Sequence, residues 1–364
     1  MSRGPHAGAG APLLCLLVAC ATEDGRASAG SVPSDPPREA EFSAEGAPET
    51  RVEHYARPLL GVRFELTLVG GAQSALDELA EEAFGVAAAV ERLANNWDPQ
   101  SELSRLNRSE STDPLPVSAE LAELLECALA GRERTGGAFD PSVGCVLEAM
   151  GFYGGEQRLL QPDELDALRP LLGAHTLRLE RADGAQGVRL WRAAPQVHVD
   201  LSALAKGWAV DRVVELLRER GVRRAFVAAG GSTVYGLGPG PPGEELGGWT
   251  FQVPDGVLWR TWWLADEAVS TSGRISMPLD PGGERVSHLI DPRTARPVEA
   301  GWGMSVFRGP SAAQADLAST ALLVLGREEA LALFEPQAAW GERAGLLVGE
   351  DGALVELGAG LLPR

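Results

Sequence analysis

Within Val199-Asp-Leu-Ser-Ala-Leu-Ala-Lys-Gly-Trp-Ala-Val-Asp211, an extended pattern gives way to a helical one. The pattern predicts a strand that ends at Asp200 and a helix over about 202–220 that stops at Gly221. Free N–H groups at a helix start favour phosphate, and Lys206 lies within about one turn (3.6 residues) of that start. This junction is therefore a candidate site for a phosphorylated ligand.

The remaining patterns extend outward from this junction. Helices are predicted over 74–94, 118–134, 312–325 and 327–335. Strands are predicted over 62–68, 176–182, 187–192, 196–199, 224–229, 232–236, 248–253 and 257–264, with two more near the C-terminus. Because strands and helices do not alternate strictly, a doubly wound parallel sheet is disfavoured. The predicted fold class is α+β, with a single layered mixed α/β domain.

The charge balance limits the ligands of the protein. The 364 residues include 51 acidic and 32 basic side chains, for a formal net charge of −19. A chain this acidic will not hold nucleic acid or an anionic membrane by bulk electrostatics. Lys206 is the only lysine among the basic residues, which suggests a site that needs a compact ammonium group rather than a planar guanidinium.

The N-terminus has the pattern of a lipoprotein signal. Arg3 precedes a short apolar run over 11–19, and Leu17-Val-Ala-Cys20 has the form of a lipobox. Residues 1–19 are therefore predicted to be removed, which leaves a lipidated Cys20 that anchors the chain without spanning the bilayer. The alternative is an ordinary secretory signal.

The mature chain is predicted to begin with a flexible linker. Residues 20–54 are rich in Ala, Gly, Ser, Pro and Glu and too polar to fold, so they are expected to tether a folded domain over 55–364. In that domain, Cys127 and Cys145 are expected to form either a disulfide or two buried thiols. The chain has no Cys/His cluster, so zinc and iron–sulfur sites are not expected.

Four further segments contain residues suited to chemistry. Two are glycine turns, Thr135–Gly144 and Ala229-Gly-Gly-Ser232, which allow close backbone approach to a ligand but also fit structural turns. A third joins Val269-Ser-Thr-Ser-Gly273 to Val286-Ser-His-Leu-Ile-Asp-Pro-Arg-Thr294, where a structural turn is again the alternative. The fourth, Ala315-Asp-Leu-Ala-Ser-Thr320, places a carboxylate and a hydroxyl four residues apart on one helical face.

The pair in this last segment suits Mg²⁺, which prefers hard oxygen ligands and binds through one or two carboxylates together with substrate phosphates. Two structural explanations compete with the metal. A helix dipole favours an acidic side chain such as Asp316 near the N-terminus, and Thr320 can bond back to the backbone.

Together these segments resemble the ApbE family of flavin transferases, many of which are periplasmic lipoproteins. Leu60-Gly61 resembles the family's Met-Gly, and Trp97-Asp-Pro-Gln-Ser-Glu-Leu-Ser-Arg-Leu-Asn107 resembles its Tyr-x-Pro-x-Ser-x-Leu-x-x-Leu-Asn segment. The other motifs follow in the family's order over about 300 residues. The resemblance implies a transferase that moves FMN from FAD to a Thr or Ser hydroxyl of an acceptor protein and releases AMP.

The resemblance also implies the residues that carry this activity. Mg²⁺ would be held by the Asp316 carboxylate, the Thr320 hydroxyl and the backbone carbonyl of Ala203. FAD would contact Leu60, Trp97, Ala138, Phe139, Asp140, Asp200 and Lys206. Trp97 can stack on a flavin or adenine ring. His288 is the candidate for proton transfer, because imidazole accepts a hydroxyl proton near neutral pH, and Lys206 would neutralise phosphate charge.

The implied partners are FAD, an acceptor flavoprotein such as a subunit of a redox-driven ion pump, and the membrane through Cys20, with the domain facing the periplasm. Two alternatives remain. Water could attack in place of the acceptor, which would make the protein a Mg²⁺-dependent FAD pyrophosphatase, or the protein could be a non-catalytic FAD-binding lipoprotein.

Two positions depart from the family pattern. Ser232 stands where the family commonly has Asp after Gly-Gly, which removes one carboxylate near the site. Ala295 replaces a glycine in Thr-Gly-x-Pro, and it would strain the turn if that position needs a positive φ.

Overall fold

The computed structural model describes residues 51–181, 187–242, 247–254, 259–274, 287–298, 301–333 and 343–358. The predicted signal over 1–19, the lipidation site Cys20 and most of the predicted linker over 20–54 lie outside the described residues. Within the described ranges, every helix is too short or too polar to cross a membrane.

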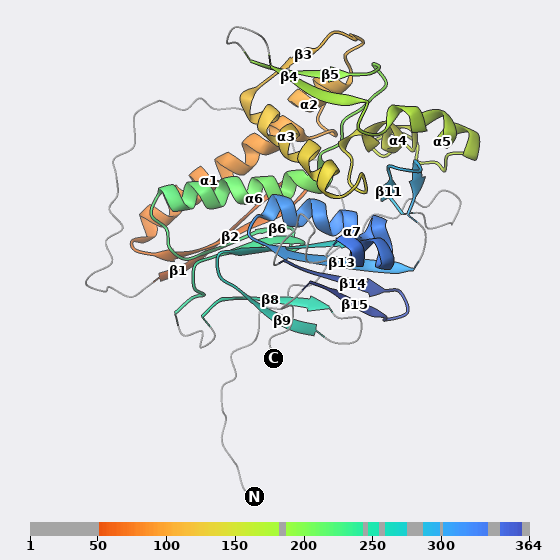
Figure 1. Cartoon of the computed structure of the whole chain (residues 1–364). Coiled ribbons are helices and arrows are strands. Elements are labelled where there is room, and N and C mark those ends of the chain that lie inside the picture. The colour runs from red at the N-terminus through yellow and green to blue at the C-terminus, as the bar shows by residue number, and fades with distance from the viewer. Residues whose placement is uncertain are drawn as a thin grey trace, which may run out of the picture. The chain divides into compact units, whose positions relative to one another are not determined.

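An eight-stranded antiparallel sheet forms the centre of the domain (Figure 1). Its spatial order is β1 (Arg51–Leu59), β2 (Val62–Gly70), β6 (Ala225–Ala229), β7 (Thr233–Leu237), β10 (Glu267–Gly273), β13 (Trp302–Gly309), β14 (Ala344–Gly349) and β15 (Leu354–Leu357). Every neighbouring pair in this order is antiparallel. The predicted α+β class is confirmed.

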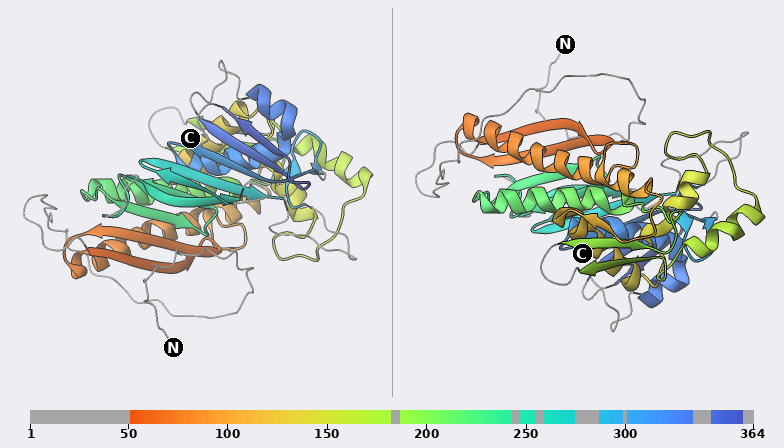
Figure 2. Two further views of the ribbon diagram at one scale, coloured as in Figure 1. Left: turned by 90° about the horizontal axis from the view of Figure 1, so that it is seen from below. Right: turned by 90° about the horizontal axis from the view of Figure 1, so that it is seen from above.

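Each face of the sheet is covered by a different kind of element. Three helices, α1 (Gln73–Ala94), α6 (Ser202–Glu219) and α7 (Ala312–Leu333), lie side by side on one face (Figures 1 and 2). The hairpin of β8 (Trp249–Pro254) and β9 (Trp259–Leu264) packs on the other face. Alternate residues of one strand therefore enter separate cores: Phe307 of β13 joins the helix side and Val306 the hairpin side.

A second group of elements lies beyond the helix layer (Figure 1). It contains a three-stranded sheet of order β3-β5-β4, several short helices and a two-stranded ribbon. Their bounds are β3 (Leu115–Val117), β4 (Leu177–Arg181), β5 (Val188–Arg192), α2 (Glu102–Asn107), α3 (Ala119–Arg134), α4 (Gly144–Ala149), α5 (Pro162–Leu168), β11 (Ile290–Asp291) and β12 (Arg296–Pro297). The loops of this group meet the N-terminal part of α6, which is the region of the predicted site.

Helices α6 and α7 approach each other closely at Gly207. A Cβ atom built on Gly207 would lie 2.2 Å from the backbone oxygen of Ala312, so a side chain here would force the two helices apart. One turn further along α6, the Asp211 carboxylate accepts hydrogen bonds from the backbone N–H groups of Ala312 (2.7 Å) and Ala313 (2.9 Å). This contact caps the start of α7 and fixes it against α6.

Many predicted elements are present within a few residues of their expected limits. The predicted helix over 118–134 becomes α3, and the Ser118 hydroxyl accepts from the Leu121 N–H as an N-cap. The two helices predicted over 312–325 and 327–335 form one element with a break at Gly326, where φ is 64° and ψ is −167°. Strands β1, β10 and β13 and helices α2, α4 and α5 were not predicted.

Three expectations need correction. Residues 51–54 were assigned to the linker, but they belong to β1, which pairs along its whole length with β2, so the domain includes residues before the predicted residue 55. The predicted strand over 196–199 is absent. Cys127 and Cys145 are both free thiols, so the disulfide alternative is wrong and the alternative of two thiols holds. Burial raises the pKa of the Cys127 thiol to about 11 and that of the Cys145 thiol to about 12, which leaves both thiols protonated near neutral pH.

The close contact of α6 with α7 predicts opposite effects of two glycine substitutions. Gly207→Ala should lower the free energy of unfolding by about 1–3 kcal/mol or more, because its methyl group meets backbone that cannot move aside. Gly85→Ala, at an exposed site of α1 with nothing within 4 Å of the new Cβ, should raise it by about 0.5–1 kcal/mol. Urea denaturation measures both; equal effects would contradict this account of the packing.

Candidate functional site

The Asp316 carboxylate is buried where α6, α7 and the sheet meet. Its Oδ2 atom accepts a hydrogen bond from the Gly207 N–H at 3.0 Å, and its Oδ1 atom accepts from the hydroxyls of Thr233 and Ser270 at 3.2 Å each. The side chain is 4% exposed. A buried carboxylate needs such donors, because an unpaired charge in the interior is strongly destabilising.

Lys206 contributes the cation of the site. Its ammonium lies 3.4 Å from Asp316 Oδ2 and donates to the backbone carbonyl of Ser202 at 3.3 Å. The lysine side chain is 24% exposed, whereas the Asp316 side chain is almost fully buried. The structure confirms that the single lysine lies in the first turns of α6 and brings it together with Asp316, while anion binding by this helix start stays a prediction.

Thr320 lies one turn beyond Asp316 on α7, among further hydroxyl groups. Its hydroxyl donates to the backbone carbonyl of Asp316 at 3.3 Å and lies 3.1 Å from the Ser272 hydroxyl. Ser272 is also 2.7 Å from the hydroxyl of Ser319. The bond from Thr320 to the backbone is the structural alternative raised from the sequence, and it leaves the oxygen lone pairs of Thr320 available to a ligand.

Ala203 is the second residue of α6, four residues before Gly207. In a regular helix the Ala203 carbonyl faces the Gly207 N–H. That N–H donates to Asp316, so the carboxylate contacts α6 one turn beyond Ala203.

These oxygens fit a hard cation. No group of three or more His, Cys, Asp or Glu side chains that could hold a metal occurs among the described residues. A metal here would depend on one carboxylate, neutral oxygens and substrate phosphates, which is the ligand set that Mg²⁺ prefers.

A second polar centre surrounds Asp200. Its Oδ2 atom accepts from the Tyr153 hydroxyl at 2.6 Å and from the Asn96 amide at 3.1 Å. Its Oδ1 atom accepts from the backbone N–H of Ser202 at 3.0 Å and from the Ser202 hydroxyl at 2.5 Å. Asp200 therefore forms an Asx-type turn that begins α6, and its position is set from both sides.

Four aromatic rings lie beside this centre. Trp97, which is 47% exposed, has its ring centroid 5.4 Å from that of Phe152 and 5.3 Å from that of Tyr153. Phe152 stacks on the His288 imidazole at 6.1 Å with an interplanar angle of 9°. The structure thus brings together Trp97, Asp200 and His288, three predicted site residues that are far apart in the sequence.

Leu60 lies at the turn between β1 and β2, in an unusual backbone conformation. Its φ is 56°, which is uncommon for a residue other than glycine. Its N–H donates to the Glu91 carboxylate of α1 at 3.0 Å. Burial raises the pKa of Glu91, and the bond from Leu60 acts in the opposite direction. Because this bond helps to hold the turn, Glu91 fixes a residue that the resemblance assigns to FAD.

The predicted loop over 138–140 follows α3. Asp140 is 3% exposed, and its Oδ1 atom accepts from the backbone N–H and the hydroxyl of Ser142 at 2.8 and 2.6 Å. The backbone of Ala138 and Phe139 turns around the Thr135 hydroxyl, which accepts from the Phe139 N–H at 3.1 Å. The backbone N–H of Asp200 bonds to the carbonyl of Pro141 at 2.7 Å, which ties this loop to the Asp200 centre.

Comparison with known proteins identifies the family of the chain. A model of the ApbE family matches residues 60–340, well over half of the chain. The chain belongs to the ApbE family.

Three relatives show the extent of the similarity. The chain is 31% identical over 261 residues to the FAD:protein FMN transferase of Escherichia coli strain K12, which covers 70% of this chain and 72% of the relative. The solved flavin transferase ApbE from Vibrio cholerae has a TM-score of 0.72 and 26% identity, covering 85% of this chain and 98% of that one. The apo flavinyl transferase ApbE of Pseudomonas stutzeri has a TM-score of 0.72 and 26% identity, with coverages of 86% and 98%.

The two departures from the ApbE pattern have different outcomes. Ala295 has a φ of 60°, so the turn does require the left-handed conformation that glycine adopts without cost. The turn strain predicted for an alanine at this position depended on a positive φ, and the structure has that φ. Ser232 donates its hydroxyl to the carbonyl of Ala229 at 3.3 Å, and its own carbonyl accepts from the Thr271 N–H at 2.8 Å. It supports the turn and adds no charge.

Sequence reasoning missed several residues of this site. Tyr153 and Phe152 lie in the unpredicted stretch after α4, and Asn96 precedes the predicted Trp97 by one residue. Aromatic residues beside glycines, as at Phe152 and Tyr153, and a lone amide such as Asn96 are too common in sequences to indicate a site. Glu91 lies within the helix predicted over 74–94, and no local pattern marks it, because its contact with Leu60 spans 31 positions in the sequence.

The three tyrosines of the chain provide a spectroscopic test. Burial raises the pKa of Tyr153 well above its usual value, and the neighbouring Asp200 raises it further. Burial is also the main cause that raises the pKa of Tyr55 and that of Tyr235. Folded protein should therefore show no phenolate absorbance near pH 10, the usual tyrosine pKa, whereas protein unfolded in guanidinium chloride should titrate there.

The same shifts predict how stability depends on pH. The folded state keeps the tyrosine protons that the unfolded state loses above about pH 10. The contribution of the tyrosines to the free energy of unfolding is therefore fully present below that pH and declines as the pH rises past it. A folded-state phenolate transition near pH 10 would contradict this account of the tyrosines.

Proposed function

We propose that this protein transfers FMN from FAD to a hydroxyl group of an acceptor protein and releases AMP. The observation that carries the proposal is the convergence of the Lys206 ammonium and the Asp316 carboxylate, 3.4 Å apart, at the start of α6. A dinucleotide anhydride needs its phosphate charge neutralised before it can be cleaved, and a chain with a net charge of −19 supplies that only locally. The similarity to the FAD:protein FMN transferase of Escherichia coli supports the same reaction.

The residues of the site would have separate roles in this reaction. Lys206 binds phosphate oxygens of FAD and orients the anhydride next to the N-terminal end of α6. Asp316, Thr320 and the Ala203 carbonyl would hold Mg²⁺, whose chemistry here is to neutralise phosphate charge as a Lewis acid. The Trp97 ring provides an exposed face on which a flavin or adenine ring can stack.

The transfer itself exchanges one P–O bond for another. His288 accepts the proton of an acceptor Thr or Ser hydroxyl, and the hydroxyl oxygen bonds to the phosphorus of the FMN half. The anhydride P–O bond breaks, and AMP leaves with the bonding electrons. Phe152, which stacks on His288, limits the orientations of the imidazole during this step.

Removal of the Asp316 carboxylate tests the reaction. Asp316→Ala and Asp316→Asn should each reduce covalent flavin on a co-expressed acceptor protein by on the order of a hundredfold or more, because charge neutralisation worth several kcal/mol is lost. In-gel flavin fluorescence under denaturing conditions measures the product. The control Asp163→Ala, at an exposed position of α5, should keep full activity. Full labelling by the folded Asp316 variants would refute the assignment.

The acceptor also separates transfer from hydrolysis. Wild-type protein incubated with FAD and Mg²⁺ should release AMP much faster when the acceptor is present than when it is absent. Rapid AMP release without an acceptor would identify a pyrophosphatase, and intact FAD in both cases would identify a binding protein.

We also propose that Cys20 is lipidated and anchors the domain to a membrane on its periplasmic side, through the polar tether that precedes β1. Cys20→Ala should move the protein from the membrane fraction to the soluble fraction, because the lipid attachment point is lost. Cys15→Ala, within the apolar run of the signal, is the matched control and should remain in the membrane fraction. Immunoblotting of cell fractions measures both; a membrane-bound Cys20→Ala protein would contradict the lipoprotein proposal.

A further inference from the structure

The carboxylate of Asp316 is fully engaged by other groups of the protein. An ionised carboxylate offers about four acceptor positions, shared between its two oxygens. Its Oδ1 atom accepts from the hydroxyls of Thr233 and Ser270 at 3.2 Å each. Its Oδ2 atom accepts from the Gly207 N–H at 3.0 Å and lies 3.4 Å from the Lys206 ammonium. A divalent cation that binds this carboxylate must therefore displace one of these donors.

The four donors differ in their freedom to move. The side chains of Thr233 and Ser270 are fully buried, on β7 and β10 of the central sheet. The Gly207 N–H belongs to the backbone of α6, which close packing holds against α7 at this residue. Lys206 has a flexible four-carbon stem, and its side chain is 24% exposed. Of the four, Lys206 is the donor that can leave the carboxylate without opening the core.

The contacts that hold the Lys206 ammonium are long. It lies 3.4 Å from Asp316 Oδ2 and 3.3 Å from the carbonyl oxygen of Ser202, whereas charge-assisted hydrogen bonds of this kind are typically about 2.7–2.9 Å long. A divalent cation carries twice the charge of an ammonium and favours hard carboxylate oxygens. A divalent cation therefore competes well with Lys206 for the Oδ2 atom.

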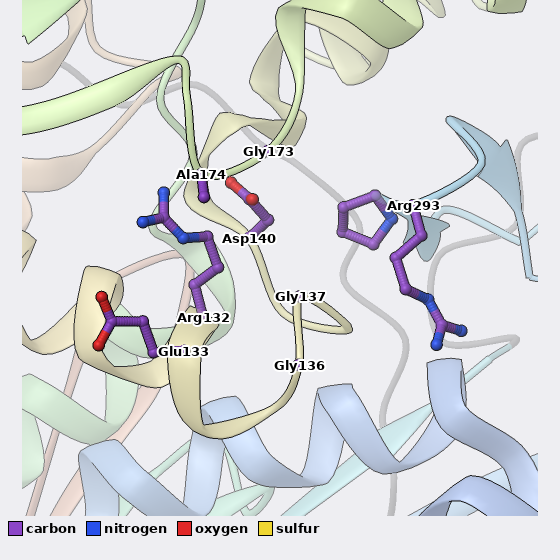
Figure 3. Close-up of a pocket in the computed structure, with 9 residues that line it drawn as sticks. Arg132, Glu133, Gly136, Gly137, Asp140, Gly173, Ala174 and Arg293 are labelled. Atoms are coloured by element: carbon purple, nitrogen blue, oxygen red, sulfur yellow. The ribbon is translucent and has the colours of Figure 1, made fainter.

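The cationic side chain that contacts Asp316 is a lysine, and nearby arginines lie elsewhere. Arg132 and Arg293 line a pocket of about 300 Å³ beside the glycine turn after α3 (Figure 3). Neither Lys206 nor Asp316 is among the residues that line this pocket. Lys206 is therefore the positive group whose position depends on what the Asp316 carboxylate binds.

We propose that the Lys206 ammonium and a divalent cation bind Asp316 Oδ2 in alternation. The ammonium pairs with the carboxylate before the cation binds, and it is released toward the N-terminal end of α6 when the cation takes its place. This inference rests on the proposed function, in which Lys206 binds phosphate oxygens of FAD. Binding of the cation then frees the lysine that binds phosphate, so the two ligands favour each other's binding.

The single lysine of the chain allows a direct test by NMR. Protein grown with lysine labelled with ¹³C at Cε gives one lysine signal, because Lys206 is the only lysine. Adding MgCl₂ without nucleotide should shift this signal by more than its linewidth, whereas NaCl at equal ionic strength should not. In Asp316→Asn the magnesium-dependent shift should be lost, because the shared carboxylate is absent.

Titration calorimetry with MgCl₂ in the absence of nucleotide measures the same competition through the cation. Lys206→Met keeps the aliphatic stem and removes the ammonium, so Mg²⁺ should bind about tenfold more tightly than to wild-type protein, within the roughly 5- to 150-fold range of coupled sites. Lys206→Arg keeps the positive charge, and its Mg²⁺ affinity should stay within about threefold of wild type. Arg212→Met removes a positive charge elsewhere on α6 and is the matched control, with an expected change below about twofold.

The other outcomes overturn the proposal. A Lys206 signal that stays in place while Mg²⁺ binds to wild-type protein would show that the cation does not displace the lysine. Equal Mg²⁺ affinity of Lys206→Met and wild type, or binding by neither, would remove the competition. A shift that persists in Asp316→Asn would place the cation at another site. The NMR measurement uses wild-type protein, so the proposal stays testable even if Lys206→Met does not fold.

Failure of the proposed function is distinguishable from failure of this inference. If the protein is not a flavin transferase, the exchange at Asp316 would be observed without flavin transfer to an acceptor. If only the exchange is wrong, wild-type protein would transfer flavin while the Lys206 signal does not respond to Mg²⁺.

Discussion

The hydrogen bond from the Gly207 N–H to the Asp316 carboxylate is the contact on which the rest of the site depends. It exists only because residue 207 lacks a side chain and lets α6 approach the backbone of α7. That approach places the Lys206 ammonium beside the Asp316 carboxylate. The Asp211 cap on α7 keeps the two helices in register. The close packing of α6 against α7 therefore also positions the charged side chains of the site.

The net charge of −19 determines where this protein can bind an anionic ligand. The field of the whole protein repels anions, so a phosphorylated ligand can be held only where positive charge is concentrated and partly shielded from water. Lys206 places one positive group near the start of α6, and Arg132 is a second positive group that is nearly buried. Most other arginines described by the structure form ion pairs on the surface, for example Arg158 with Glu164 and Arg220 with Glu82, and contribute little to ligand binding.

The sequence predicted the elements whose signals are local. Helix α6 and its end at Gly221, the Ser118 cap of α3 and the break of α7 at Gly326 all follow from periodicity, capping residues and glycine. Strands β10 and β13 were not predicted, because small and polar residues dominate β10 and interrupt the apolar residues of β13. The two strands pair within a sheet that long-range contacts create. The stretch over 196–199 alternates like a strand, but it pairs with the Asn107 side chain, which bonds both the N–H and the carbonyl of Val199.

The site residues also divide into those with a local sequence signal and those that only long-range contacts bring together. Motifs located Lys206, Asp316, Thr320 and His288, but contacts such as Tyr153 with Asp200 arise only from tertiary structure.

Since no other lysine exists, an amine-directed reagent has one side-chain target in the whole chain, and that target is 24% exposed and beside a buried carboxylate. Acylation would cancel its charge and add bulk at the mouth of the helix junction. A single covalent label can therefore be attached at Lys206. The degree to which a bound ligand protects Lys206 from the reagent would report whether the helix junction is occupied.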